Sequence, residues 1–143
     1  MTNATIETLK KRRSIYAIGT KTSLSTEAKM KMFAAGVGTV LFYEDNAAIE
    51  ALQEAYPLYA PAFPGFAEHS NGMAQISVWN ALADAGLGAT LQHYSNLIEE
   101  PVAKEFGLSA KWSLKAQMPF GSIESPAGER SFIADEGRFL TFK

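Results

Sequence analysis

One segment of the chain is apolar on nearly every side, and it constrains the fold more than any other feature. Residues 68–85, EHSNGMAQISVWNALADA, read as a helix whose apolar side chains are spread around the helical wheel instead of forming one stripe. A helix of this kind must be covered on most of its surface, so we expect it in the middle of the structure. Gly86 follows directly and is well placed to end the helix as a left-handed cap.

Segments rich in β-branched and aromatic residues predict strands on both sides of this helix. GTVLFYED, residues 38–45, predicts a buried strand over Thr39–Tyr43. SLKAQMPFGSIES, residues 113–125, predicts a later strand because its apolar residues alternate. The residues expected on one face of that strand are Leu114, Ala116 and Met118. RFLTF, residues 138–142, is a last strand-like patch with little core left to cover.

Shorter helices are predicted between these segments. Residues 3–13 form one, and Asn46 can cap another that Pro57 closes. The prolines and aromatic residues of 56–66 favour an ordered connecting loop that packs its rings together. A further short helix carries Pro101 in its first turn, where a proline is tolerated.

The composition limits what the protein can do. With 143 residues, of which 47% are hydrophobic and 20% charged, we expect a single domain over residues 1–143. A net charge of −2 argues against a nucleic-acid partner, and no apolar run is long enough to cross a membrane. The chain has no cysteine and two distant histidines, so we expect no metal site. The polar N-terminus lacks an apolar signal core, and we therefore expect a cytoplasmic protein.

Four cationic residues follow one another in LKKRRSIYAIG, residues 9–19. On the helix predicted for residues 3–13, Arg13 lies on the side of Ile6 and Leu9 and is directed toward the interior. A buried guanidinium needs an anion, and a phosphate or carboxylate would satisfy it. The other interpretation is a helix C-terminus stabilised by cations.

No familiar catalytic motif is present. The chain lacks a phosphate-binding Walker loop, and GVGTV precedes a strand where a dinucleotide fingerprint would follow one. His93 comes just after the glycine turn that opens GLGATLQHY, residues 86–94, so it can either touch a ligand or be an ordinary surface residue. The catalytic residues therefore stay unknown.

Taken together, several segments resemble the nitroreductase family, in the branch of the fatty-acid repression mutant proteins. They are LKKRRSIYAIG, GTVLFYED, the long stretch from YPLYAPAFPGF through GMAQ to GLGATLQHY, and KAQMPFGSIESPAGE, and they cover nearly the whole chain. The resemblance implies an α+β fold with a central antiparallel or mixed sheet packed with helices. It also implies a homodimer with FMN at each subunit interface, and electron transfer from NADH or NADPH to nitroaromatics, quinones or related small-molecule acceptors.

The resemblance assigns cofactor-binding roles to three parts of the chain. Its phosphate-binding element corresponds to Arg12, Arg13 and Ser14. Its glycine turn, whose backbone approaches the flavin ring, corresponds to Gly86, Leu87, Gly88 and Ala89, with Gln92 and His93 close behind. Arg138 corresponds to a basic residue near the C-terminus that completes the phosphate site. For the turn the other interpretation is an ordinary helix cap, and for Arg138 a surface ion pair.

The chain is also shorter than these relatives at one internal position. They carry a block with an element like PSAFNSQ and a strand, whereas here Glu27 runs directly into Ala28. Two functions follow. The first is an FMN-dependent NAD(P)H oxidoreductase, and the alternative is a catalytically impaired member that acts as a dimeric binding or regulatory module.

Overall fold

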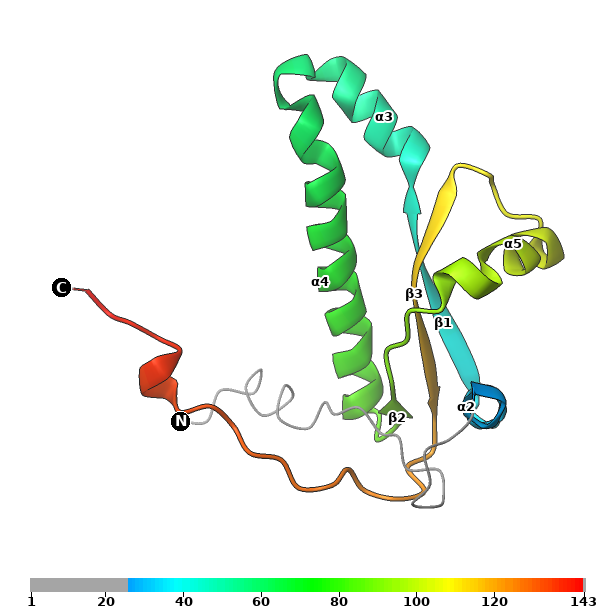
Figure 1. Ribbon diagram of the computed structural model, residues 1–143, viewed down its shortest axis with the longest axis vertical. Coiled ribbons are helices and arrows are strands. Elements are labelled where there is room, and N and C mark those ends of the chain that lie inside the picture. Colours follow the sequence, from blue (N-terminus) through cyan, green and yellow to red (C-terminus); the bar gives the residue numbers. More distant parts are fainter. Residues whose placement is uncertain (1–25, 143) are drawn as a thin grey trace.

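A computed structural model describes residues 26–142 of the chain. Its regular elements follow the order α2 (Thr26–Ala34), β1 (Gly38–Asp45), α3 (Asn46–Ala55), η1 (Pro57–Ala62), α4 (Phe63–Asp84), β2 (Gly88–Ala89), α5 (Ser95–Phe106), β3 (Trp112–Gly121) and η2 (Asp135–Gly137). The helix predicted for residues 3–13 lies outside the described residues. The strands of the described part form one antiparallel sheet in the order β1-β3-β2, with α4 standing along one side of it (Figure 1).

The two predicted strands are confirmed. The strand expected over Thr39–Tyr43 is β1, which extends a little further at both ends, and it pairs along its whole length with β3. Leu114, Ala116 and Met118 are all buried, as their alternation predicts. With Phe42 and Ala89 of the sheet and Trp79 of α4, Ala116 and Met118 form the buried core.

The pairing of β1 with β3 contains a β-bulge. Phe42 lies opposite Ala116, but the next residue, Tyr43, lies opposite Leu114, so Lys115 has no residue opposite it. A bulge of this kind turns a side chain away from the direction that strict alternation would give it. Lys115 consequently reaches the start of α4, where it contacts Glu68.

The long helix differs from its prediction in extent and in burial. It starts at Phe63 instead of Glu68, and the expected connecting loop is the short helix η1 followed by the first turn of α4. Within α4 only Asn71 and Trp79 are buried. The expectation of a helix enclosed by the structure is therefore wrong for the described part of the chain, in which a three-stranded sheet covers α4 from one side.

Three local predictions are also wrong. The side chain of Asp45, not that of Asn46, caps α3 by accepting a hydrogen bond from Ala47 N. Pro101 is not in the first turn of its helix, because α5 begins at Ser95. The side chain of Gln117 holds this start by hydrogen bonds to Tyr94 and Ser95. RFLTF, residues 138–142, forms no strand and is exposed, because no described strand lies beside it to pair with.

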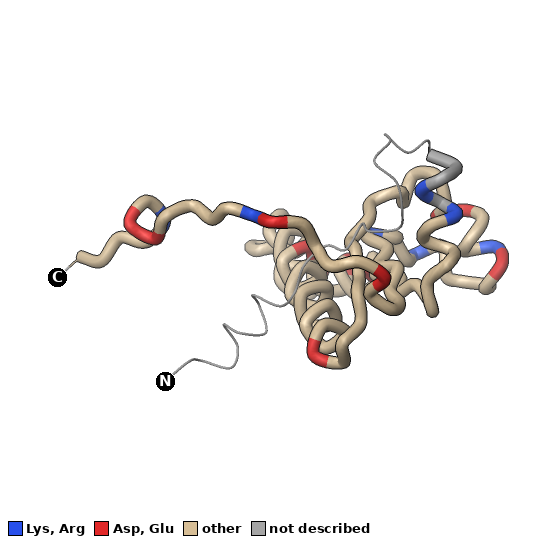
Figure 2. The backbone as a smooth tube through the Cα atoms, turned by 90° about the horizontal axis from the view of Figure 1, so that it is seen from below, with Lys and Arg blue, Asp and Glu red and all other residues tan. Residues whose placement is uncertain are grey.

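The C-terminal segment after β3 leaves the body of the molecule. The ribbon and tube views show it running away from the sheet and the helices, with η2 as its one helical turn (Figures 1 and 2). Its large apolar side chains are exposed, Phe142 at 89% and Leu140 at 76%. Among the described helices, none combines the length and the apolar character that crossing a membrane requires.

Candidate functional site

The glycine turn after α4 has the predicted geometry. Gly86 adopts a φ of 77°, in the left-handed region that favours glycine. The two N–H groups at the turn satisfy the last helical carbonyls, Gly86 N to Ala83 O at 3.1 Å and Leu87 N to Leu82 O at 2.9 Å. A Cβ at Gly86 would meet no atom within 4 Å, so the turn is open on that side.

The chain beyond the turn runs as a short edge strand along β3. Thr90 N donates to Pro119 O at 3.1 Å, and Gln92 N donates to Gln117 O at 2.7 Å. Because alternate residues of a strand direct their N–H groups to the same side, the N–H groups of Ala89 and Leu91 point away from β3. They face an edge of the sheet that no described strand covers.

A buried glutamine holds this edge strand in place. Gln117, at 4% exposure, accepts a hydrogen bond from Tyr94 N at 2.7 Å through its side-chain oxygen. Its side-chain nitrogen donates to the hydroxyl of Ser95 at 2.9 Å. Both contacts lie at the start of α5, which has no side-chain cap of its own. Gln117 therefore fixes both the edge strand and the helix that follows it.

Three chain segments meet closely at this end of the sheet. Val37 N donates to Phe120 O at 2.8 Å, and β2 pairs with β3 where Gly88 lies opposite Gly121. A Cβ at Gly36 would lie 2.6 Å from Phe120 O, closer than packing allows. The glycines here serve the approach of backbone to backbone.

The structure gathers six of the predicted site residues on one continuous segment. These residues are Gly86, Leu87, Gly88, Ala89, Gln92 and His93. The side chain of Gln92 donates to the Thr90 hydroxyl at 2.8 Å, and His93 is exposed. Sequence reasoning missed Thr90 and Gln117, and the one signal for Gln117 was a polar residue among the alternating apolar positions of its strand.

The predicted phosphate-binding residues are not among these six. Arg12, Arg13 and Ser14 are outside the described residues. Arg138 is on the C-terminal segment, where its guanidinium stacks over the ring of Phe139 at 5.2 Å, away from the glycine turn within the same chain. Across residues 26–142, no group of three or more His, Cys, Asp or Glu residues is arranged to hold a metal ion.

Relatives of the chain come from comparisons with individual proteins, since no family model matches it. The protein HBN1 of Saccharomyces cerevisiae is 39% identical over 99 residues, which are 69% of this chain and 50% of HBN1. Nitroreductase FRM2 of the same yeast is 36% identical over 96 residues, which are 67% of this chain and 49% of FRM2. The chain thus spans about half the length of the curated relatives it matches.

Solved structures show the same likeness over the whole chain. Nitroreductase CinD from Lactococcus lactis, in complex with nicotinic acid, matches with a TM-score of 0.87 at 36% identity, covering 98% of this chain and 100% of that chain. A nitroreductase with bound FMN from Bacteroides fragilis, at 13% identity and a TM-score of 0.51, shares the fold alone. The protein belongs to the nitroreductase family, and the family resemblance and the α+β fold expected from the sequence are confirmed.

Proposed function

We propose that the protein is an FMN-dependent oxidoreductase that transfers hydride from NADH or NADPH to nitroaromatic, quinone or related small-molecule acceptors. The observation that carries this proposal is the likeness to CinD, which extends over 98% of this chain at 36% identity. CinD has also been solved in complexes with chloramphenicol and 4-nitrophenol, both of which carry a nitro group. Nitroaromatic compounds are therefore the first acceptors to test.

The sheet edge beside Ala89, with which no described strand pairs, is the place that we assign to the flat, hydrogen-bonding ring of the cofactor. The N–H of Ala89 is directed to this edge and is not used by the pairing with β3. Gly86 has no side chain to block the approach of a ring, and a Cβ there would find open space. When bound, FMN supplies the hydride chemistry, and the protein's part is to position the ring with backbone donors.

The phosphate of the cofactor is assigned to basic residues from both ends of the chain. Arg12, Arg13 and Ser14 would hold it from the N-terminal segment, with the Arg13 guanidinium able to make two parallel hydrogen bonds to phosphate oxygens. Arg138 would complete the site. Because the C-terminal segment that carries Arg138 runs away from the sheet and the helices of its own chain, we assign Arg138 to the site of a second copy.

A homodimer is the second part of the proposal. The outer side of α4 and the C-terminal segment expose large apolar side chains that a monomer would leave in water. They include Met73 at 61% and Phe66 at 53% on α4, and Phe132 at 69%, Ile133 at 73%, Phe139 at 65%, Leu140 at 76% and Phe142 at 89% on the C-terminal segment. A second copy packed on α4 and reached by the C-terminal segment would cover both sets.

A turnover assay tests the activity. Protein supplied with FMN is mixed with NADH or NADPH and 4-nitrophenol or another nitroaromatic, and loss of the nicotinamide absorbance is followed. Acceptor-dependent oxidation above the rate of free FMN supports the proposal. A rate equal to that of free FMN contradicts it and favours the impaired binding module, for which the internal block missing between Glu27 and Ala28 is the specific argument.

A further inference from the structure

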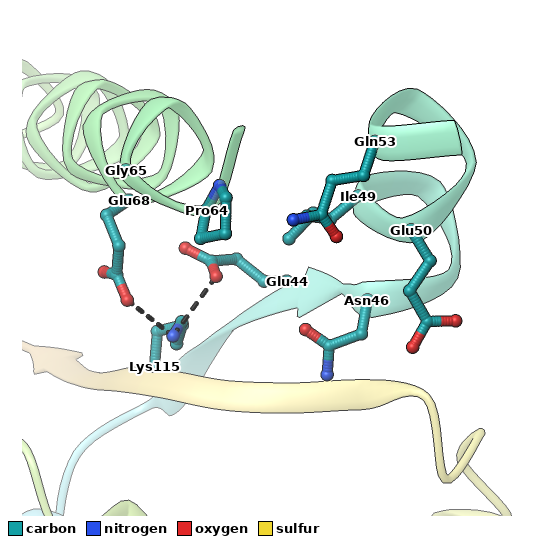
Figure 3. Close-up of a pocket in the computed structure, with 9 residues that line it drawn as sticks. All are labelled: Glu44, Asn46, Ile49, Glu50, Gln53, Pro64, Gly65, Glu68 and Lys115. Carbon is teal, nitrogen blue, oxygen red and sulfur yellow. Dashed lines mark hydrogen bonds and ion pairs between the residues drawn. The ribbon is translucent and has the colours of Figure 1, made fainter. Parts of the chain in front are cut away.

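Two long polar side chains lie close together on β3, and they have different kinds of partner. Lys115 is turned toward the start of α4, where it lies 3.1 Å from Glu44 and 2.6 Å from Glu68 (Figure 3). Gln117 is 4% exposed, and its two side-chain hydrogen bonds go to neutral groups at the start of α5. Burying an amide is costly unless it is hydrogen-bonded, and these bonds pair both its oxygen and its nitrogen.

The edge strand beside Gln117 is too short to hold its place by main-chain pairing alone. Its regular part, β2, is two residues long, and beyond it the pairing includes an isolated bridge between Gln92 and Gln117. A short edge strand frays easily unless both of its ends are fixed. The first end is fixed by the cap of α4, where Gly86 N and Leu87 N donate to helical carbonyls.

The second end is fixed by the side chain of Gln117. If the antiparallel pairing continued past Gln92, Tyr94 N would face the main-chain carbonyl of Lys115. The chain turns into α5 here instead, and Tyr94 N donates to the side-chain oxygen of Gln117 at 2.7 Å. The side-chain nitrogen donates to the hydroxyl of Ser95, the first residue of α5, at 2.9 Å. The Gln117 side chain thus replaces a strand carbonyl at the point where the edge strand leaves the sheet.

We propose that Gln117 is a positioning residue for the cofactor. Its side chain holds residues 88–94 in the register that directs the N–H groups of Ala89 and Leu91 toward the sheet edge assigned to FMN. This inference rests on the proposed function, because it concerns the edge that the flavin ring would use. Loss of the Gln117 amide should loosen the edge strand from its Tyr94 end, while β1 and β3 stay paired.

Two methionine variants of β3 separate positioning from stability. Gln117→Met approximates the length of the side chain and removes both of its hydrogen bonds. Lys115→Met is the matched control, because it also places methionine on β3 and removes the partner of the buried Glu44 carboxylate. Both variants should unfold at lower urea concentrations than the unchanged protein. Gln117→Met alone should loosen the edge strand.

Amide hydrogen exchange, followed by NMR in flavin-free protein, measures the edge strand without the cofactor. In Gln117→Met, the N–H groups of Gln92 and Tyr94 should exchange about tenfold faster relative to the paired amides of β1, as expected for loss of about one hydrogen bond. Lys115→Met should leave this ratio unchanged. An unchanged ratio in Gln117→Met, or an equal rise in both variants, would overturn the proposal.

FMN titration then measures the consequence for the cofactor. Gln117→Met should bind FMN about tenfold more weakly than the unchanged protein, and the visible circular dichroism of its bound FMN should change because the ring is held differently. Lys115→Met should match the unchanged protein in both measurements. If Gln117→Met does not fold, Ser95→Ala removes one of the two side-chain hydrogen bonds and should produce the same changes to a smaller extent.

The outcomes distinguish this inference from the proposed function. If the unchanged protein binds FMN and Gln117→Met binds it equally well with the same circular dichroism, the role of Gln117 is overturned and the proposed function stands. If the unchanged protein binds no FMN, the proposed function fails and the cofactor role of Gln117 fails with it. Hydrogen exchange in the flavin-free protein still decides whether Gln117 holds the edge strand.

Discussion

Gln92 and Gln117 exchange two main-chain hydrogen bonds, from Gln92 N to Gln117 O at 2.7 Å and from Gln117 N to Gln92 O at 2.9 Å. This pair fixes the register of the edge strand against β3. The N–H groups of every second residue from Gln92 back toward the turn then face β3. The N–H of Ala89 therefore faces the edge of the sheet that no described strand covers. The proposed contact with the flavin ring follows from this register.

Substituting proline at Ala89 tests the proposed contact between its N–H and the flavin ring. Proline has no N–H, and because Ala89 is 3% exposed and belongs to the buried core, the folding of Ala89→Pro is checked by circular dichroism. It should weaken FMN binding by about 1–3 kcal/mol, the cost of one lost hydrogen bond to a polar group in a site that excludes water. FMN fluorescence titration measures the change.

Thr90→Pro is the matched control for that variant. It removes an N–H that donates to Pro119 O at 3.1 Å, so it should lower the free energy of unfolding, as thermal unfolding would show. Full FMN affinity in a folded Ala89→Pro would show that the edge beside Ala89 is not the flavin site.

Arg13 and Lys11 should differ in their effect on FMN. If Arg13 holds the phosphate from the Ile6 and Leu9 side of its helix, Arg13→Ala should weaken FMN binding by about 2–4 kcal/mol. On the helix expected from the sequence for residues 3–13, Lys11 falls on the opposite side, so Lys11→Ala should leave FMN binding nearly unchanged. Titration of FMN into both variants, with folding checked by circular dichroism, measures the contrast. Similar losses would indicate that the basic run attracts anions only in a general way.

Stability should fall at alkaline pH. Hydrogen bonding to Glu68 raises the pKa of Lys115, Glu44 raises it further, and desolvation opposes them. A group whose pKa is higher in the folded than in the unfolded protein stabilises the fold. Its contribution is complete at pH values below the unfolded pKa and is lost as the pH rises through the folded pKa. Burial, together with the charge of Glu99, also raises the pKa of Tyr43, which acts in the same direction. Urea unfolding should therefore show constant stability up to about pH 10 and a decline above it.

The ion cluster around Lys115 provides the check on this pH dependence. Lys115→Met should lower stability at neutral pH, because the buried Glu44 carboxylate loses its partner, and it should flatten the alkaline decline. Lys104→Met, on the exposed side of α5, should change neither. An alkaline decline of unchanged steepness in Lys115→Met would assign the pH dependence to other groups.

Charge placed on the outer side of α4 should separate the proposed dimer. Met73 is 61% exposed in one chain, and Met73→Lys would bury a charge at the expected interface. We expect sedimentation to find the unchanged protein dimeric at micromolar concentration and the variant monomeric. Ala110→Lys adds the same charge in an exposed turn and should stay dimeric. A monomer for the unchanged protein would contradict the proposed assembly.

The parts of the fold that local patterns encode were predictable, and the parts that depend on distant contacts were not. The alternation of apolar residues predicts the burial of Leu114, Ala116 and Met118, and the place of Gly86 directly after a helix predicts its left-handed conformation. The bulge at Lys115 depends on the pairing with β1, and no pattern within either strand indicates it. The burial of Gln117 was not predictable, because its partners, at Tyr94 and Ser95, lie more than twenty residues earlier. The cover expected for α4 requires contacts that the described residues do not provide.

The most direct test of the account is whether the protein retains a flavin. The purified chain is soaked with FMN, passed through a desalting column and examined for visible flavin absorbance. The account predicts that FMN stays with the protein in a stoichiometric amount and that folded Ala89→Pro retains less of it. A folded, unchanged protein that emerges colourless would contradict the proposed FMN-dependent activity.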